Sequence, residues 1–312
     1  MTGLGEIAAL GAALMWSISS LIFGGTRLSA WALNFAKNAI GMIVVFSALV
    51  LWAAINGTSL LPVPLSAIGY LAVSGVVGLT VGDTLFFRSL QILGPRRALV
   101  MATTTPVFGA LLGWIILGEP LFPLTLAGIL ICIGGVSVVV MERRAKREAP
   151  GLYPGRLRVG VMMGLAAAFC QAAGLAISKI AMESCTPLEA TLFRLLVAVL
   201  AAALVMLAGR QLLATLRSIC QPKILMRVIP ASVIGTFLGV WFSQIGVKHT
   251  SMAIATTLLS TSPLFAIPLI WLVHGHRVSW RAATANLVAI AGVFLVVARS
   301  WQDLLALLAG RG

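Results

Sequence analysis

Acidic residues are scarce in this sequence. Asp and Glu together number 8 in 312 residues, and charged residues of both signs make up 10% of the chain. A water-soluble domain is about 25% charged and about 45–50% apolar, whereas 60% of this chain is hydrophobic. So few polar side chains cannot cover a surface that faces water. We therefore predict an all-α integral membrane protein in contact with membrane lipid.

Cysteine and histidine are also rare. The four cysteines have no Cys-x-x-Cys spacing, and the three histidines have no partner at the spacing of metal ligands. The sequence therefore predicts no metal site and no cofactor. It contains no Walker motif, no HExxH motif and no paired intramembrane aspartates. We expect a protein that is not an enzyme; a membrane-embedded enzyme and a receptor or assembly subunit are the alternatives.

Long apolar runs occupy most of the chain, and a membrane helix needs about 20 mainly apolar residues. Ten segments qualify: 4–23, 33–55, 66–91, 97–117, 122–141, 159–180, 187–208, 228–247, 252–273 and 281–298. A basic linker, 142–158, divides them into two sets of five. We predict a first five-helix domain over 1–141, a second over 159–298 and a short tail over 299–312.

The 22 basic residues are unevenly distributed. Sixteen lie in or near one set of connections and four on the side that holds both termini. The positive-inside rule therefore predicts that the basic connections are cytoplasmic and that both termini lie outside. Cations grouped at span ends indicate orientation and lipid contact rather than nucleic-acid binding.

The two halves of the chain resemble each other. With a shift of 157 residues and no gap, 13 of 44 positions between 97–140 and 254–297 are identical, where a chain of this composition would match at about one in ten. Each unit has five predicted spans, an odd number, so the second unit starts from the opposite side of the membrane and has the inverted orientation. Inverted repeats are the recurrent architecture of secondary transporters, with the substrate near the midplane.

These repeats resemble the EamA-type domain of the drug/metabolite transporter superfamily. The residues that match its pattern are Pro106, Val107, Phe108, Gly118 and Glu119 in the first unit and Pro263, Leu264, Phe265 and Gly275 in the second, where His276 replaces the usual Glu. The resemblance implies a ten-helix carrier of a small metabolite, often an exporter, in the bacterial inner membrane. Members are commonly drawn with cytoplasmic termini, opposite to the orientation that the charge count predicts.

Some residues are expected to serve helix packing or gating. Gly78 and Gly82 form a Gly-xxx-Gly pair, and the 157-residue shift puts them on Gly235 and Gly239; such pairs let helices approach closely in lipid. Pro106 and Pro263 follow hydroxyl triplets, and each is expected to kink a gating helix. The hydroxyl groups of Thr104 and Thr261 either bond to carbonyls freed by the kink or bind cargo.

Polar residues deep in the predicted spans are candidates for a substrate cavity. Asn34, Lys37 and Asn38 share one helix face, which is too polar to face lipid and either lines a cavity or forms hydrogen bonds between helices. The other candidates are Trp16, Gln171, Arg194 and Gln244, and Trp16 also has a packing interpretation. Lys37 and Arg194 occupy equivalent positions of the two repeats.

Asp83 is a carboxylate in the middle of an apolar run. It lies roughly 18 Å from the end of its predicted helix near Pro95, at a depth where a charge costs about 2.5–3.5 kcal/mol on insertion scales. Its repeat partner is Val240, so the shared scaffold does not require the carboxylate. The sequence leaves open an ion pair with Lys37 or another cation, and a role in cargo binding or coupling to protons. It does not specify the coupling ion, the cargo or the oligomeric state.

Overall fold

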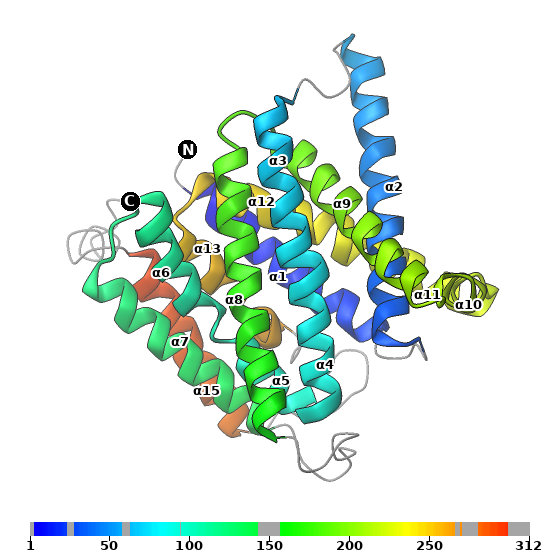
Figure 1. Ribbon diagram of the computed structural model, residues 1–312. Helices are drawn as coiled ribbons and strands as arrows, with labels where there is room; N and C mark the ends of the chain where they lie inside the picture. Colours follow the sequence, from blue (N-terminus) through cyan, green and yellow to red (C-terminus); the bar gives the residue numbers. More distant parts are fainter. Residues whose placement is uncertain are drawn as a thin grey trace.

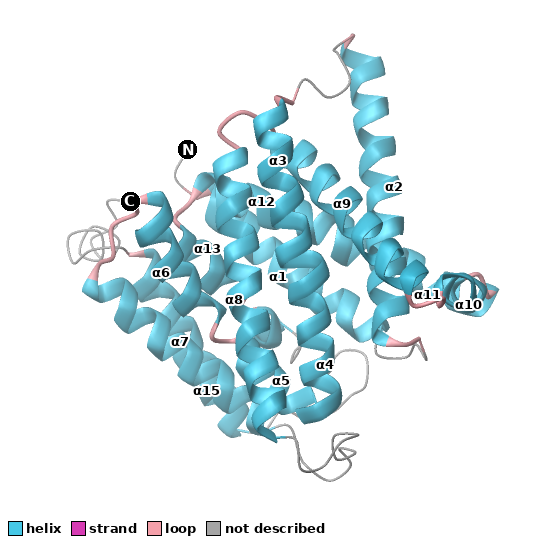
Figure 2. Ribbon diagram, viewed as in Figure 1, coloured by secondary structure: helices cyan, strands magenta, loops and turns pink. Residues whose placement is uncertain are grey.

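The structure is a computed structural model that describes residues 3–23, 28–57, 63–93, 95–142, 157–265, 269 and 280–298. Within these residues the chain forms helices joined by short turns, with no strand (Figure 2). Seven helical stretches are long and apolar enough to cross a membrane, and three shorter apolar helices fall inside the predicted spans 122–141, 252–273 and 281–298. The prediction of an all-helical membrane protein is therefore confirmed.

The first half of the chain contains seven α-helices and a π-helix among its described residues. They are α1 (Leu4–Phe23), α2 (Ala30–Asn56), α3 (Leu65–Ser74), the π-helix η1 (Gly75–Gly82), α4 (Asp83–Leu93), α5 (Pro95–Ala102), α6 (Thr105–Leu117) and α7 (Pro123–Glu142). The predicted span 66–91 thus contains a stretch of π-helix, and the predicted span 97–117 is interrupted by a turn at Thr103 and Thr104.

The described part of the second half follows a similar order. Its elements are α8 (Leu157–Ala181), α9 (Pro187–Ala208), α10 (Leu212–Ile219), α11 (Pro222–Ser232), the π-helix η3 (Val233–Leu238), α12 (Gly239–His249), α13 (Met252–Leu259) and α15 (Trp280–Val297). The short helix α10 was not predicted. Most of the predicted linker, the tail, and the His276 corner lie outside the described residues.

Local sequence signals begin and end these helices. α9 begins with a capping box, in which Thr186 and Glu189 satisfy each other's backbone N–H groups, and Pro187 stands in its first turn. α2 begins at Ser29, whose hydroxyl accepts from the Ala32 N–H, and ends at Gly57 in the left-handed conformation. These signals fix where α2 and α9 begin, and α2 and α9 are the helices that carry Lys37 and Arg194.

Two helices of the first half pack against the helix that occupies the equivalent position in the second half. With the 157-residue shift, α2 corresponds to α9 and α7 to α15, and both of these pairs are in contact (Figure 1). The two π-helices also correspond, and η1 contacts α8 as η3 contacts α1. π-Helical turns are rare and are frequently found at functional sites.

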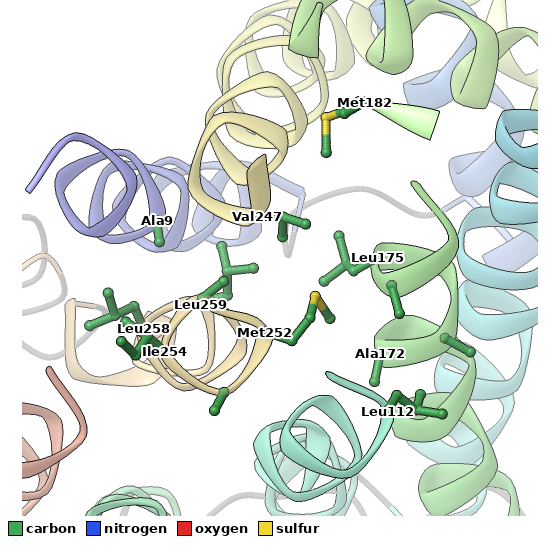
Figure 3. Close-up of a cluster of buried hydrophobic side chains, with 14 of the residues drawn as sticks. Ala9, Leu112, Ala172, Leu175, Met182, Val247, Met252, Ile254, Leu258 and Leu259 are labelled. Atoms are coloured by element: carbon green, nitrogen blue, oxygen red, sulfur yellow. The ribbon is translucent and has the colours of Figure 1, made fainter. Parts of the chain in front are cut away.

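The largest buried apolar cluster joins the two halves. Figure 3 shows Ala9, Leu112, Ala172, Val247 and Leu258 pointing into a common core. These residues come from α1, α6, α8, α12 and α13. The polar groups described below are therefore set among tightly packed helices of both halves.

Candidate functional site

Lys37 and Asp83 form an ion pair between α2 and α4. The Lys37 Nζ lies 2.8 Å from the Asp83 Oδ2, and their side chains are 15% and 14% exposed. Lys37 lies about 10 Å along α2 from its first residue. Asp83 begins α4, but α3, η1 and α4 form one helical stretch, Leu65–Leu93, and Asp83 lies about 15 Å from its last residue. Both residues therefore lie well inside a helical stretch that is long enough to cross a membrane. Of the alternatives that the sequence leaves open for Asp83, the structure shows an ion pair, and the cation is Lys37.

Amide groups extend this ion pair into a hydrogen-bonded chain. The Gln171 Nε2 of α8 donates to the Asp83 Oδ1 at 2.6 Å, and the Lys37 Nζ donates to the Asn38 Oδ1 at 3.3 Å. The Asn38 Nδ2 donates to the Asn34 Oδ1 at 3.1 Å. The Asn34 Nδ2 in turn donates to the backbone oxygen of Leu79, within η1, at 3.2 Å. Polar groups from four elements thus meet at one place, and the predicted Asn-Lys-Asn face points to it.

Arg194 forms a second polar group, with Gln244 and Ser178. The Arg194 Nη1 donates to the Gln244 Oε1 at 2.5 Å, and the Gln244 Nε2 donates to the Ser178 Oγ. Arg194 is 1% exposed and Gln244 is fully buried. The Arg194 Nε has no hydrogen-bond acceptor among the described residues. Ser178 is seven residues after Gln171 on α8, so both polar groups face the same side of that helix.

The π-helix η1 lies between the two polar groups, and its glycines give them room. A Cβ atom at Gly78 would lie 3.2 Å from the Arg194 Nη2. A Cβ atom at Gly82 would lie 3.3 Å from the Cβ of Cys170 on α8 and near the backbone of Gln171. Small residues here allow α8 to approach η1 closely, which is what the Gly-xxx-Gly pattern predicts.

The equivalent glycines, Gly235 in η3 and Gly239 at the start of α12, pack against α1 instead. A Cβ atom at Gly235 would meet the Ser19 side chain, and one at Gly239 would lie 2.7 Å from the indole ring of Trp16. The Trp16 Nε1 donates to the Gly235 backbone oxygen at 3.0 Å. Trp16 therefore packs on the second π-helix, apart from the hydrogen-bonded chains around Asp83 and Arg194.

The two prolines follow breaks in their helices. Pro106 lies in the first turn of α6, after the turn that follows α5. Pro263 comes after the turn that begins at Ser260, the residue that caps α13. The Thr104 Oγ1 donates to the Met101 backbone oxygen and the Thr261 Oγ1 to that of Leu258, each at 2.6 Å. These hydroxyl groups bond to carbonyls of the interrupted helices, which is one of the two roles that the sequence allows them.

A third polar cluster, the Glu119 cluster, lies at the end of the bundle where α6, α8 and α12 end and α13 begins. The Glu119 Oε1 is 2.6 Å from the Lys179 Nζ, and the Glu119 Oε2 accepts from the Met252 N–H at 2.7 Å. Lys179 also donates to the Thr250 backbone oxygen at 2.6 Å. One carboxylate thus connects three helices and stabilises the N-terminal end of α13.

The position of Glu119 depends on the two glycines near it. Gly118 ends α6 in the left-handed conformation, which turns the chain back. A Cβ atom at Gly113 would lie 2.7 Å from the Glu119 Oε2, so the carboxylate fits because Gly113 has no side chain. The cluster borders a cavity of about 340 Å³, whose lining includes Lys248, His249, Thr125 and Ile254.

Cys185 lies in the connection between α8 and α9. Burial raises the pKa of its thiol to about 11, the Glu189 carboxylate adds to the rise, and the Lys248 ammonium offsets part of it. Its backbone oxygen accepts from the Lys248 Nζ at 2.8 Å. This thiol is therefore protonated and unreactive at neutral pH.

Sequence reasoning missed part of this arrangement. It assigned no partner to Lys179 or Ser178 of α8, which contact Glu119 and Gln244. It also missed the π-helices; the signal available was the matched glycines of 75–82 and 235–239.

Comparisons with known proteins agree with this architecture. A solved crystal structure, titled only as a protein, superposes with a TM-score of 0.75 over 98% of both chains at 20% identity, which shows the fold. An uncharacterized protein of Pseudomonas aeruginosa is 29% identical over 148 residues, which are 46% of this chain and 49% of that relative. The match thus spans about half of the relative. The family model described as the EamA-like transporter family matches residues 3–141 and 158–298. The chain therefore belongs to the EamA-like transporter family.

Proposed function

We propose that the protein is a secondary transporter with ten membrane helices, arranged as two inverted five-helix repeats over 1–141 and 159–298. Membership of a transporter family supports a carrier. The contacts between repeat-equivalent helices, and the matched π-helices, support the two-repeat arrangement. The single observation that carries the proposal is the presence of three charged side chains beside η1, with Lys37 and Asp83 partly buried and Arg194 fully buried, in a chain with so few charges.

Removing a charge from water at this depth costs free energy, so such charges are kept where they serve a function. In membrane transporters they commonly mark the path of substrate or ions. The group lies where α2, η1, α4, α8 and α9 meet, so elements of both proposed repeats contribute to it. We assign the cargo site to this junction, with Asn34, Asn38, Gln171 and Gln244 as its polar lining. Flux measured with and without a pH gradient in Asp83→Asn tests whether Asp83 also carries a coupling proton.

Alternating access requires gates on both sides of such a site. The helix breaks before Pro106 and Pro263 support movement of α6 and of the segment after α13, because an interrupted helix bends with less loss of backbone hydrogen bonds. The Glu119 cluster supports a gate at its end of the bundle, since it connects α6, α8 and α13 through one carboxylate. The unequal distribution of basic residues supports the opposite end as cytoplasmic, with both termini outside.

The cargo is a small metabolite, amino-acid-like or amphipathic, and the direction is export from a bacterial cell. An untargeted comparison of metabolites inside and outside cells, with and without the protein, tests this. A solute that accumulates outside only when the protein is present supports the carrier. Unchanged distribution of all solutes would contradict it and would favour the receptor or assembly alternative.

A further inference from the structure

Arg194 is a deeply buried cation that forms no ion pair with an acidic residue in the described part of the chain. It is 1% exposed, and it is the largest fully buried side chain among the described residues. Among the described residues its one hydrogen-bond acceptor is an uncharged amide oxygen, that of Gln244. An uncompensated charge inside a membrane protein is costly, and buried arginines are normally paired with an anion.

The charges around Arg194 do not balance. Asp83 is the carboxylate that acts electrostatically on Arg194, but it already forms a 2.8 Å ion pair with Lys37. Two cations and one carboxylate leave an excess of one positive charge. Glu119 pairs with Lys179, and Glu189 caps the first turn of α9 through Thr186. An anion of charge −1 would therefore neutralise the charges beside η1, whereas a phosphate ester, at about −1.5 to −2, would carry too much charge.

The unused part of the guanidinium has the geometry for a carboxylate. Gln244 holds the Nη1, which orients the group. The Nε–H has no acceptor, and Gly78 has no side chain to cover the Nη2. The Nε and Nη2 atoms form one edge of the planar guanidinium, whose two parallel N–H bonds match the two oxygens of a carboxylate.

We propose that this edge of Arg194 binds a carboxylate group of the cargo, which is therefore a small organic acid with one carboxylate in excess of its positive charges. The assignment rests on the carrier function proposed above and names the substrate class of the same site. Lys37, at the equivalent position of the first repeat, has its carboxylate built in as Asp83, whereas Arg194 receives its carboxylate from the cargo.

The test begins with cells that express the wild-type protein, the Arg194→Gln variant or no protein. Metabolites inside and outside are compared, and every solute whose distribution depends on the wild-type protein is identified. We expect these solutes to be carboxylic acids of net charge −1, and we expect Arg194→Gln to reduce their redistribution strongly. Neutral, cationic or zwitterionic solutes, or phosphate esters, would overturn the carboxylate subsite while leaving the carrier function intact. If no solute changes, both the carrier function and the subsite fail.

Counterflow in proteoliposomes then tests the residue, with the identified acid and its primary amide as probes. We expect Arg194→Gln to raise the apparent KM for the acid at least about tenfold, because loss of a buried hydrogen-bonded charge pair is a large loss of binding. Arg194→Lys keeps the charge but loses the two-pronged contact, so it should recover only part of the affinity. Arg217→Gln, an exposed cation outside the site, is the matched control and should behave as wild type.

Two outcomes of the counterflow would overturn the proposal. One is a wild-type KM for the acid in Arg194→Gln. The other is equal transport of acid and amide by the wild-type protein, a comparison that needs no variant and so decides the matter even if Arg194→Gln does not fold.

Discussion

Lys37 and Asp83 form their 2.8 Å ion pair at positions whose repeat equivalents are Arg194 and Val240. A cation therefore stands on the second helix of both repeats, while the carboxylate occurs in one repeat alone. Because Val occupies the equivalent position, the fold itself accepts an apolar residue there. Asp83 therefore pairs with Lys37, and Arg194 has no acidic partner among the residues that the structure describes.

Removing the Asp83 carboxylate should destabilise the protein. In Asp83→Val, Lys37 keeps its charge in a partly buried place without a partner, and the loss of unfolding free energy should be on the order of 3 kcal/mol. Thermal unfolding of the purified protein measures this. The double variant Lys37→Leu/Asp83→Val should recover most of the loss, because both charges are then absent. Wild-type stability of the single variant would contradict a structural ion pair.

Asp83→Asn separates proton coupling from this structural role. The amide keeps the size of the side chain and can still accept from Gln171, but it cannot take up or release a proton. If Asp83 carries the coupling proton, the variant loses flux driven by a pH gradient and keeps cargo exchange. Wild-type pH-driven flux in Asp83→Asn would exclude that role. Flux in proteoliposomes with and without a pH gradient makes the comparison.

Glu119→Gln should weaken the connection of α6, α8 and α13. The variant keeps an oxygen that can accept from the Met252 N–H, but it loses the charge that pairs with Lys179. We expect the end of the bundle to open more often, and a loss of 1.4 kcal/mol would raise the open fraction about tenfold. The measurement is the rate at which a cysteine introduced at Thr125, in the wall of the cavity, is alkylated.

The matched control for this experiment is Glu183→Gln, which removes an acidic residue from the neighbouring connection between α8 and α9. It should leave the alkylation rate at Thr125→Cys unchanged. An unchanged rate in Glu119→Gln as well would show that its ion pair does not hold this end closed.

The native cysteines test the orientation. Cys220 is exposed between α10 and α11, at the basic end, so an impermeant maleimide should label it in permeabilised cells and not in intact ones. Cys185 should stay unlabelled at pH 7.5 in both, because burial raises the pKa of its thiol to about 11. The rate at which Cys185 is labelled should increase about tenfold for each unit by which the pH is raised, up to the pKa, because the thiolate is the nucleophile.

Cys220→Ser identifies the labelled site, and it should abolish the signal in permeabilised cells. Labelling of Cys220 in intact cells would reverse the orientation and put both termini in the cytoplasm.

Pro106→Ala and Pro263→Ala should slow transport and leave the amount of protein in the membrane near the wild-type level. Pro106 is in the first turn of α6, where the missing N–H is not needed for a helix bond, so its replacement costs little stability. Alanine restores an N–H donor and a good helix former next to the break, which favours a continuous helix. Flux per molecule of reconstituted protein is the measurement, and unchanged flux in both variants would remove the gating role.

Helix positions were the part of the fold that the sequence could predict. The predicted span 4–23 is α1, and the predicted span 187–208 is α9, because long apolar runs with clear ends follow directly from the thickness of a bilayer. The π-helices were missed, since an apolar run looks the same in sequence whether its hydrogen bonds span four residues or five; the matched glycines were the available signal. The sequence named Lys37 as one possible partner of Asp83. It could not select Lys37 among the other cations, because the rotation of each helix about its axis, which decides what Asp83 faces, does not follow from the sequence.

Two adjacent glycines of α7 provide a sharp test of the contact between α7 and α15. A Cβ atom at Gly135 would lie 2.6 Å from the Ala289 N and 2.8 Å from the Ala285 backbone oxygen, atoms that can move only with the helix itself. A Cβ atom at Gly134 would meet nothing within 4 Å. Gly135→Ala should therefore force the two helices apart and lower the unfolding free energy by about 1–3 kcal/mol, whereas Gly134→Ala should not destabilise the protein. Because both variants add one methyl group to the same helix, any change in helix propensity is shared, and the difference between their thermal unfolding midpoints reports the helix contact alone. Equal midpoints would show that α7 and α15 do not pack as closely as their backbones indicate.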